Sequence, residues 1–387
     1  QHVTSGELGA RGAIVVVRHT LQRNLSERCD RLRTMTTTAL HPTQMDNPVQ
    51  WAKRFPRIRY MGSKYRLLPQ LADVFNEVGG KSVVDAFSGS GVVSYLLKAQ
   101  GFDVTSNDFL NFSSVIARAS VENSHENLNR EEVSAICGPS ADDRDFIIST
   151  FHGLYFDEED LRFLDSAWSH ISTMSGYKKD IAISALVLSA ARKQPRGVFT
   201  VTDPSKYADG RRSLRMTLKE HFCEAVEDYN QIIFGNGWQA KSYCGDVFDL
   251  PFTAPDIVYF DPPYAPRSDD ADYTKRYHFL EGLSVYWDGL PIMENTKTKK
   301  IPKRHTPFAN KRTVEDALVR LFEQFRDSGA IVMSYSSNAV PEAERMVELL
   351  RTVKSDVEMR SIDYNYSFGT HPAAVKRSAQ ELIFIGR

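Results

Sequence analysis

"KSVVDAFSGSGVVSYLLKAQGFDVTSNDFL", residues 81–110, holds a strand, a glycine turn, a helix and a second strand in direct succession. The run 82–87 is short and β-branched, which predicts a buried strand. Apolar residues then recur at helical spacing, and Gly101 is predicted to cap the C-terminus of that helix. The run 103–108 predicts the next strand. This β-α-β order implies a parallel sheet with right-handed crossovers.

The rest of the chain continues this pattern after a long helical interruption. Residues 110–236 are mostly helical by their apolar spacing. Short apolar runs then return and alternate with helical segments up to the end of the chain. The sequence therefore predicts an α/β open sheet with helical material inserted between its two halves. We expect the sheet domain at 51–125 and 237–387 and the insertion at 126–236.

Composition narrows the class of protein. With 387 residues, 42% hydrophobic and 25% charged, the chain suits one large domain and a smaller inserted one. Its longest apolar run, 181–191, is too short to span a bilayer, so we expect no membrane association. The four cysteines include no CxxC pair, and the ten histidines show no HExxH spacing. These patterns predict a cytoplasmic protein without a metal site.

The N-terminal segment differs in composition from the remainder. Residues 1–34 hold six Arg and no Lys without apolar periodicity, and Met35 opens a polar segment. We expect 1–34 to lie outside the folded protein and not to be native coding sequence, within an extension at 1–50. A transit peptide is the rival interpretation, because Arg-rich ends can be targeting signals, although three acidic residues speak against it.

Positive charge is concentrated in two segments, although the net charge of the whole chain is only −1. Residues 192–219 carry eight Lys or Arg against two Asp, and residues 297–312 carry seven Lys or Arg and no acid. Two basic segments on an otherwise acidic body predict a polyanionic partner that is contacted at defined places. For each segment alone, the alternative is an ordinary solvated loop.

The turn "DAFSGSG" (85–91) lies between a strand and a helix, where glycine permits positive φ and a close backbone approach to a ligand. It is not a GxGxxG dinucleotide fingerprint, because residue 94 is Ser. Asp108 ends the next strand, where a carboxylate can bind ribose hydroxyls; a helix N-cap is the alternative. Asp246 ends a further strand, where it can accept a hydrogen bond from an exocyclic amine; a turn residue is the alternative.

A second turn, "YFDPPYAP" (259–266), follows an apolar run. Because proline ends strands, we expect Asp261 at the carboxyl end of a buried strand, at the edge of a cleft. Its carboxylate and the carbonyl of Pro262 offer two acceptors, and Tyr264 offers a flat ring. These groups fit an aromatic exocyclic amine such as N6 of a flipped-out adenine. Accepting both amine protons favours attack by the nitrogen, and Pro263 helps to stiffen the turn.

The order of "RYMGSK" (59–64), "FSGSG" and "DPPY" resembles the D12 class of DNA adenine-N6 methyltransferases, the Dam-like, alpha-type group. The resemblance covers about residues 55–387. It implies a Rossmann-like, S-adenosylmethionine-dependent methyltransferase sheet with helices on both faces and an inserted, mostly helical target-recognition region. It further implies a site-specific enzyme that methylates N6 of a flipped-out adenine in duplex DNA, in a restriction-modification, orphan or phage system.

The same resemblance implies a role for each matching residue. The cofactor S-adenosylmethionine would be bound by Tyr60, Lys64, Asp85, Phe87, Gly89, Gly91, Asp108, Asp246 and Val247. The target adenine would be bound, and its reaction promoted, by Asp261, Pro262, Pro263 and Tyr264. The family often has Trp where this chain has Tyr60, which changes the ring beneath the cofactor.

The resemblance also implies where DNA would bind. Phosphate contacts are expected from Arg192, Lys193, Arg196, Lys206, Arg211, Arg212, Lys299, Lys300, Lys303 and Arg304. Phe199 or Tyr207 would wedge or stack against a base. A segment containing Tyr277, His278 and Glu281 would close over the flipped base, unless these residues are structural. The expected partners are duplex DNA and a cognate restriction endonuclease, and the enzyme is expected to be a monomer.

Other functions stay open at this point. An RNA adenine-N6 methyltransferase would use the same chemistry in a different channel. A silent protein that only binds cofactor and nucleic acid would be expected to have a damaged DPPY or glycine turn, and both are intact. A glutamine-N5 enzyme usually has Asn, and a cytosine-N4 enzyme more often Ser, in place of Asp261. Direct in-line transfer needs no nucleophilic Cys, and Asp261 would take the surplus proton or pass it to water.

Overall fold

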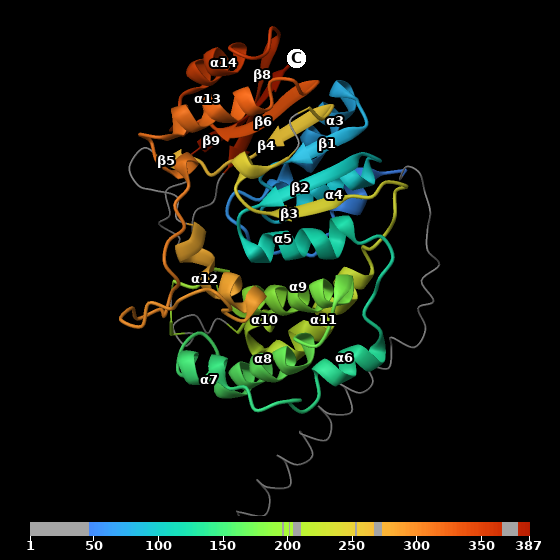
Figure 1. Cartoon of the computed structure of the whole chain (residues 1–387), viewed down its shortest axis with the longest axis vertical. Coiled ribbons are helices and arrows are strands. Elements are labelled where there is room, and N and C mark those ends of the chain that lie inside the picture. The colour runs from blue at the N-terminus through green and yellow to red at the C-terminus, as the bar shows by residue number, and fades with distance from the viewer. Residues whose placement is uncertain are drawn as a thin grey trace, which may run out of the picture.

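The framework of the protein is a seven-stranded sheet with the order β3-β2-β1-β4-β6-β9-β8 (Figure 1). It is seen in a computed structural model that describes residues 46–195, 197–200, 202–203, 210–251, 254–266, 273–365 and 378–387. The parallel strands are β1 (Ser82–Asp85), β2 (Asp103–Asp108), β3 (Lys241–Cys244), β4 (Ile257–Phe260) and β6 (Ala330–Ser336). The antiparallel ones are β8 (Val357–Asn365) and β9 (Ser378–Gly386). A separate pair joins β5 (Ala265–Pro266) to β7 (Ala339–Val340).

Alternate residues of the central strands fill two cores, one on each face of the sheet. Val83 of β1 and Tyr259 of β4 belong to one core, while Val84 and Phe260 belong to the other. This follows from the period of two along a strand. A sheet buried on both faces explains why these strands are nearly continuous apolar runs in the sequence.

Helices cover both faces (Figure 1). One face packs against α3 (Leu68–Val78), α4 (Val92–Ala99) and α5 (Asn111–Ala117). Two short helices, α2 (Pro48–Ala52) and η2 (Lys64–Arg66), come before α3 in the chain. The other face packs against α13 (Val314–Gln324) and α14 (Ala343–Arg351). Short turns of helix complete the sheet domain at η3 (Arg118–Glu122), η5 (Val247–Asp249) and η6 (Pro307–Ala309). The predicted α/β fold, with helices on both faces of a Rossmann-like sheet, is confirmed.

Among the described residues, six α-helices follow α5 and η3 and form the insertion before β3, below the sheet in Figure 1. They are α6 (Arg130–Ile136), α7 (Phe146–Phe151), α8 (Glu158–Ile171), α9 (Gly176–Lys193), α10 (Arg212–Arg215) and α11 (Leu218–Asn230). The chain breaks between α10 and α11 because the Thr217 side chain caps the second helix together with Glu220. α9 lies in the middle of this layer and packs against α5, α11 and α12 (Tyr273–Val285).

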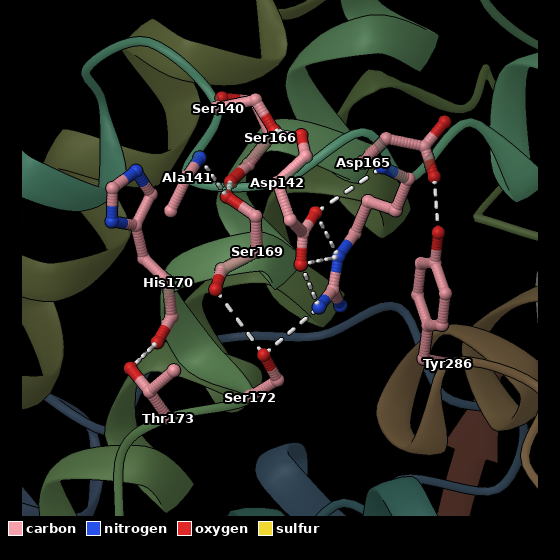
Figure 2. A network of polar contacts seen from close by, with 11 residues as sticks. Ser140, Ala141, Asp142, Asp165, Ser166, Ser169, His170, Ser172, Thr173 and Tyr286 are labelled. Atoms are coloured by element: carbon pink, nitrogen blue, oxygen red, sulfur yellow. Dashed lines mark hydrogen bonds and ion pairs between the residues drawn. The ribbon is translucent and has the colours of Figure 1, made fainter.

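A polar network ties the insertion to the segment that follows the DPPY turn. Figure 2 shows Tyr286, directly after α12, with its hydroxyl donating to Asp165 of α8 at 2.6 Å. The same carboxylate accepts hydrogen bonds from the amides of Ile147 and Ile148 in α7. Two insertion helices are therefore anchored to the chain that leaves the edge of the sheet.

Part of the predicted N-terminal extension lies outside the described residues, namely 1–45, and α2 begins at Pro48. In the part of the chain that the structure describes, no helix is both long and apolar enough to cross a membrane. The same residues include no group of three His, Cys, Asp or Glu side chains that could hold a metal ion.

Candidate active site

The carboxyl ends of β1 and β4 border an open cavity of about 620 Å³. The strand order reverses at this place, because the chain goes from β1 to β2 on one side and later returns to β4 on the other. Open α/β sheets bind their ligands at such a switch point. The lining residues include Met61, Gly62, Ser63, Ser88, Ser90, Val92, Val93, Phe109, Tyr259 and Tyr273.

Ten of the predicted cofactor and catalytic residues also line this cavity: Tyr60, Lys64, Asp85, Phe87, Gly89, Asp108, Asp261, Pro262, Pro263 and Tyr264. The structure thus gathers residues that are up to two hundred positions apart in the sequence. Three others are not among the lining residues. Gly91 is the N-cap of α4 with a φ of 82°, Asp246 accepts a hydrogen bond from the amide of Phe248, and Val247 is buried.

Asp108 anchors the glycine turn to the end of β2. Its Oδ2 accepts a hydrogen bond from the Gly89 amide at 2.8 Å, and its Oδ1 accepts one from the Leu110 amide at 2.9 Å. Burial raises the pKa of Asp108 to about 6, against the lowering effect of these two amides. Gly89 has a φ of 50°, and an added Cβ would lie 3.0 Å from the Tyr60 ring. Glycine is therefore required here both by its conformation and by the close approach.

Asp85 presents a buried carboxylate at the end of β1. Its Oδ2 accepts a hydrogen bond from Ser94 Oγ at 2.5 Å. The Phe87 amide lies near the carboxylate, yet Oδ1 is buried without a hydrogen bond of good geometry to the described residues. Burial raises the pKa of Asp85 to about 7. An unsatisfied carboxylate oxygen beside a cavity suits a ligand that brings a hydrogen-bond donor or a positive charge.

Asp261, directly after β4, is held by side chains. Lys64 Nζ donates to both carboxylate oxygens at 2.7 Å, and Ser334 Oγ donates to Oδ1 at 3.1 Å. Burial alone would lower the pKa of Lys64, but the negative charges of Asp261 and Glu381 outweigh it and raise this pKa. Burial raises the pKa of Asp261, and Lys64 opposes that change. The ammonium is therefore charged and serves as the main partner of Asp261.

The Tyr264 ring is fixed where it lines the cavity. Its hydroxyl oxygen lies 2.5 Å from Glu381 Oε1 and 3.1 Å from Asp261 Oδ1. A hydroxyl has one hydrogen to donate, so the nearer Glu381 receives it. Lys64 Nζ lies 5.0 Å from the centre of the ring, and Tyr335 packs edge-on at 4.9 Å.

An aromatic cluster contributes Tyr60 and Tyr273 to the lining of the cavity. Tyr60 stacks on Tyr277 of α12, with ring centres 5.1 Å apart and planes at 4°, and Tyr273 lies 5.7 Å away. The Tyr277 hydroxyl accepts a hydrogen bond from the Met61 amide at 2.7 Å. Sequence reasoning noticed Tyr277 but missed Tyr273, although two rings at i and i+4 of a helix share one face.

Two neighbouring polar residues of α12 lie in the core. Glu281 is fully buried and accepts hydrogen bonds from the backbone and side chain of Asn111 at the start of α5. His278 bonds through Nε2 to the carbonyl of Phe199. Burial lowers the pKa of His278 to about 4, so the ring is neutral near pH 7. His278 and Glu281 are therefore structural residues of the core, which was the alternative to a role in closing over the base.

Several predicted DNA-contacting residues form ion pairs within the protein. Arg192 pairs with Asp228, Lys193 with Asp160, Arg212 with Glu224 and Lys299 with Glu294. Arg304 donates to the carbonyl of Phe109 and lies 3.8 Å from Glu281. Lys300 and Lys303 are partly exposed on the same segment as Arg304, and Arg211 donates to the carbonyl of Pro195. Arg196 and Lys206 lie outside the described residues.

Two aromatic residues, Phe199 and Tyr207, were predicted to wedge or stack against a base. Phe199 is fully buried and stacks on Phe279, with ring centres 4.8 Å apart. The prediction for Phe199 is therefore wrong, because its ring belongs to the core of the insertion. Tyr207 lies outside the described residues.

Two polar residues of the site were not predicted. Ser334 of β6 bonds to Asp261 and to the hydroxyl of Tyr259, and Glu381 of β9 bonds to Tyr264. A signal existed for Glu381, because an acidic residue directly before the apolar run "LIFIG" is out of place on a buried strand.

The fold and this cavity define a Rossmann-like α/β protein with a ligand site at the switch point of its sheet. Residues 60–284 match the family described as D12 class N6 adenine-specific DNA methyltransferase, and the chain belongs to that family. The predicted family and the predicted function, methylation of adenine N6 in DNA, are therefore confirmed.

Curated relatives are similar over most of the chain. Type II methyltransferase M2.HphI of Haemophilus parahaemolyticus is 26% identical over 320 residues, which cover 79% of this chain and 89% of that protein. Modification methylase StsI of Streptococcus sanguinis is 24% identical over 351 residues, covering 84% of this chain and 51% of that protein. Type II methyltransferase M.FokI of Planomicrobium okeanokoites is 26% identical over 326 residues, which cover 76% of this chain and 47% of that protein. The chain thus spans about half the length of the last two.

Proposed function

We propose that this protein transfers a methyl group from S-adenosylmethionine to N6 of an adenine that is flipped out of duplex DNA, at a defined sequence. The observation that carries the proposal is the position of Asp261 at the cavity edge, between Tyr264 and the Lys64 ammonium. We further propose that the methylation protects DNA in a restriction-modification system, because similar proteins are named modification methylases or type II methyltransferases.

The residues present fit the cofactor. The charged side chains that line the cavity are Asp85, Asp108, Asp261 and Lys64, an excess of negative charge that suits a ligand with sulfonium and ammonium groups. When bound, the cofactor would supply an electrophilic methyl group on its sulfonium, and a neutral thioether would be the leaving group. Asp85 has an unsatisfied oxygen for a donor of the methionine part, and Gly89 lines the same cavity. Asp108 retains free lone pairs for ribose hydroxyls beside its two amide bonds.

We propose that the target amine competes with Lys64 for Asp261. The ammonium donates to both carboxylate oxygens, and the amine is proposed to take the place of one of these hydrogen bonds. Asp261 then accepts a hydrogen bond from one N–H of the amine, and the carbonyl of Pro262 is proposed to accept a hydrogen bond from the other. The nitrogen gains the methyl group and loses one proton, which Asp261 takes or passes to water. Tyr264 supplies the ring against which the base stacks.

DNA is proposed to approach along the second basic segment. Arg304 of this segment bonds to the carbonyl of Phe109, a residue that lines the cavity. The segment 297–312 therefore contacts a cavity-lining residue through Arg304, and its lysines are proposed to neutralise phosphates beside a flipped base.

A labelling experiment tests the proposed function. Purified protein is incubated with methyl-labelled S-adenosylmethionine and, in parallel, with unmethylated duplex DNA and with RNA, and the digested nucleosides are identified by mass spectrometry. We expect label in N6-methyladenine from DNA alone. Label in RNA alone, or in a base other than adenine, would contradict the proposal. Sequencing of the modified sites then gives the recognition sequence.

A further inference from the structure

Glu381 is a buried carboxylate that lies outside residues 60–284, the part that matches the family. It stands on β9 before the apolar run Leu382–Ile385, and none of its surface is exposed. Antiparallel pairing places Glu381 opposite Ser336, at the carboxyl end of β6 and therefore at the edge of the sheet that bears the cavity. A carboxylate in such a place needs cationic or hydrogen-bonding partners.

Two of its partners belong to the active site. Tyr264 Oη donates to Glu381 Oε1 at 2.5 Å, and Lys64 Nζ lies 3.3 Å from the same oxygen. Lys64 Nζ also lies 2.7 Å from the Asp261 carboxylate. One ammonium therefore bridges two carboxylates. The Asp261 side chain is 19% exposed, whereas Glu381 is fully buried.

This bridge matters at the step in which the target amine displaces Lys64 from Asp261, so the inference rests on the proposed function. With Asp261 as its sole anion, a displaced ammonium would stay buried without a counter-ion and would compete with the amine. Glu381 offers a second anion within contact distance, toward which the ammonium can move.

We propose that Glu381 is a positioning residue for methyl transfer. It receives the Lys64 ammonium while the target amine occupies Asp261, and it holds the Tyr264 hydroxyl so that the ring keeps its orientation. This exchange changes hydrogen bonds alone, without breaking a covalent bond or moving a proton between the three groups.

The variant Glu381→Gln tests this role, because the amide oxygen can still accept from Tyr264 while the charge that receives Lys64 is lost. The control is Glu358→Gln on the neighbouring strand β8, where Glu358 pairs with Arg360 away from the cavity. We expect E381Q to bind cofactor and DNA within about threefold of the wild type, and its single-turnover methylation rate to fall by about tenfold or more. The control should keep its rate and both affinities.

A double variant separates action through Lys64 from general damage. If Glu381 acts through the ammonium, Lys64→Met combined with E381Q should be no slower than Lys64→Met alone, whereas multiplied losses would overturn the inference. A structural role predicts instead a lower unfolding temperature and an unchanged rate wherever the variant is folded.

The outcome also distinguishes this inference from the proposed function. A wild-type protein that methylates DNA, together with an E381Q variant of equal rate, would overturn the inference alone. A wild-type protein that binds cofactor but methylates neither DNA nor RNA would overturn the proposed function, and the role of Glu381 with it.

Discussion

The carboxyl ends of β2 and β4, the two strands that flank β1, each carry an aspartate, but the two carboxylates are held in different ways. Asp108 after β2 accepts from the backbone amides of Gly89 and Leu110. Asp261 after β4 is held mainly by the side chain of Lys64. Backbone donors are fixed by the fold, whereas a side chain can rotate away. Asp108 is therefore suited to hold a turn in place, and Asp261 to exchange one partner for another.

Removing the exchangeable carboxylate should have the largest effect. Asp261→Ala deletes the proposed acceptor of the amine proton, so we expect the methylation rate to fall by more than about a hundredfold. Cofactor affinity should remain close to that of the wild type, because the glycine turn is untouched. Single-turnover assays and calorimetry measure the two quantities. A variant that keeps more than a few per cent of the rate would refute this role of Asp261.

Weakening the fixed carboxylate should affect stability and binding instead. In Asp108→Asn, the side-chain NH2 group faces one of the two backbone amides, which then loses its acceptor. This should lower the free energy of unfolding by about 1–3 kcal/mol. Cofactor affinity should fall by about tenfold, while the rate at saturating cofactor stays within about threefold. Urea denaturation and calorimetry measure these changes. Asp103→Asn, at the other end of β2, is the matched control and should change little.

A third carboxylate, Asp85, is expected to make cofactor affinity depend on pH. Its pKa of about 7 in the free protein means that it is mostly protonated at pH 6 and ionised at pH 8. A cationic ligand prefers the ionised form, so affinity should rise with pH across this range, by up to about tenfold, and then level off. Ser94→Ala removes a hydrogen bond that lowers the pKa, so the rise should move to higher pH. An affinity independent of pH would contradict this account.

The smallest effect is expected on the DNA side. Lys300→Gln removes one partly exposed cation from the basic segment 297–312. We expect DNA affinity to fall a few-fold and the slope of log K against log salt to decrease by about 1. Filter binding at several salt concentrations measures both. Arg326→Gln, which breaks an ion pair with Glu323 after α13, should leave the slope unchanged. If both variants behave alike, the segment does not contact phosphates.

The glycine turn and the DPPY turn could be predicted from the sequence, because each of them directly follows a short apolar strand. The predicted strands at 82–87 and 103–108 correspond to β1 and β2, and their carboxyl ends carry the residues that meet at the cavity. The parallel order of these strands brings such ends to one edge of the sheet.

Residues whose place depends on long-range pairing could not be predicted. Glu381 reaches the site because β9 pairs antiparallel with β6, and Ser334 because β6 lies beside β4. A run of basic residues likewise does not reveal that Arg192 pairs with Asp228 on another helix. Phe199 lies near a basic loop in sequence, but its ring is buried against Phe279, which no local pattern indicated.

The most direct test is a side-by-side measurement of single-turnover methylation of duplex DNA by Asp261→Ala and Asp108→Asn, each saturated with S-adenosylmethionine. We expect the first variant to be almost inactive and the second to keep most of the wild-type rate. Equal losses in the two variants, or a greater loss in Asp108→Asn, would contradict the distinction between an exchangeable and a fixed carboxylate.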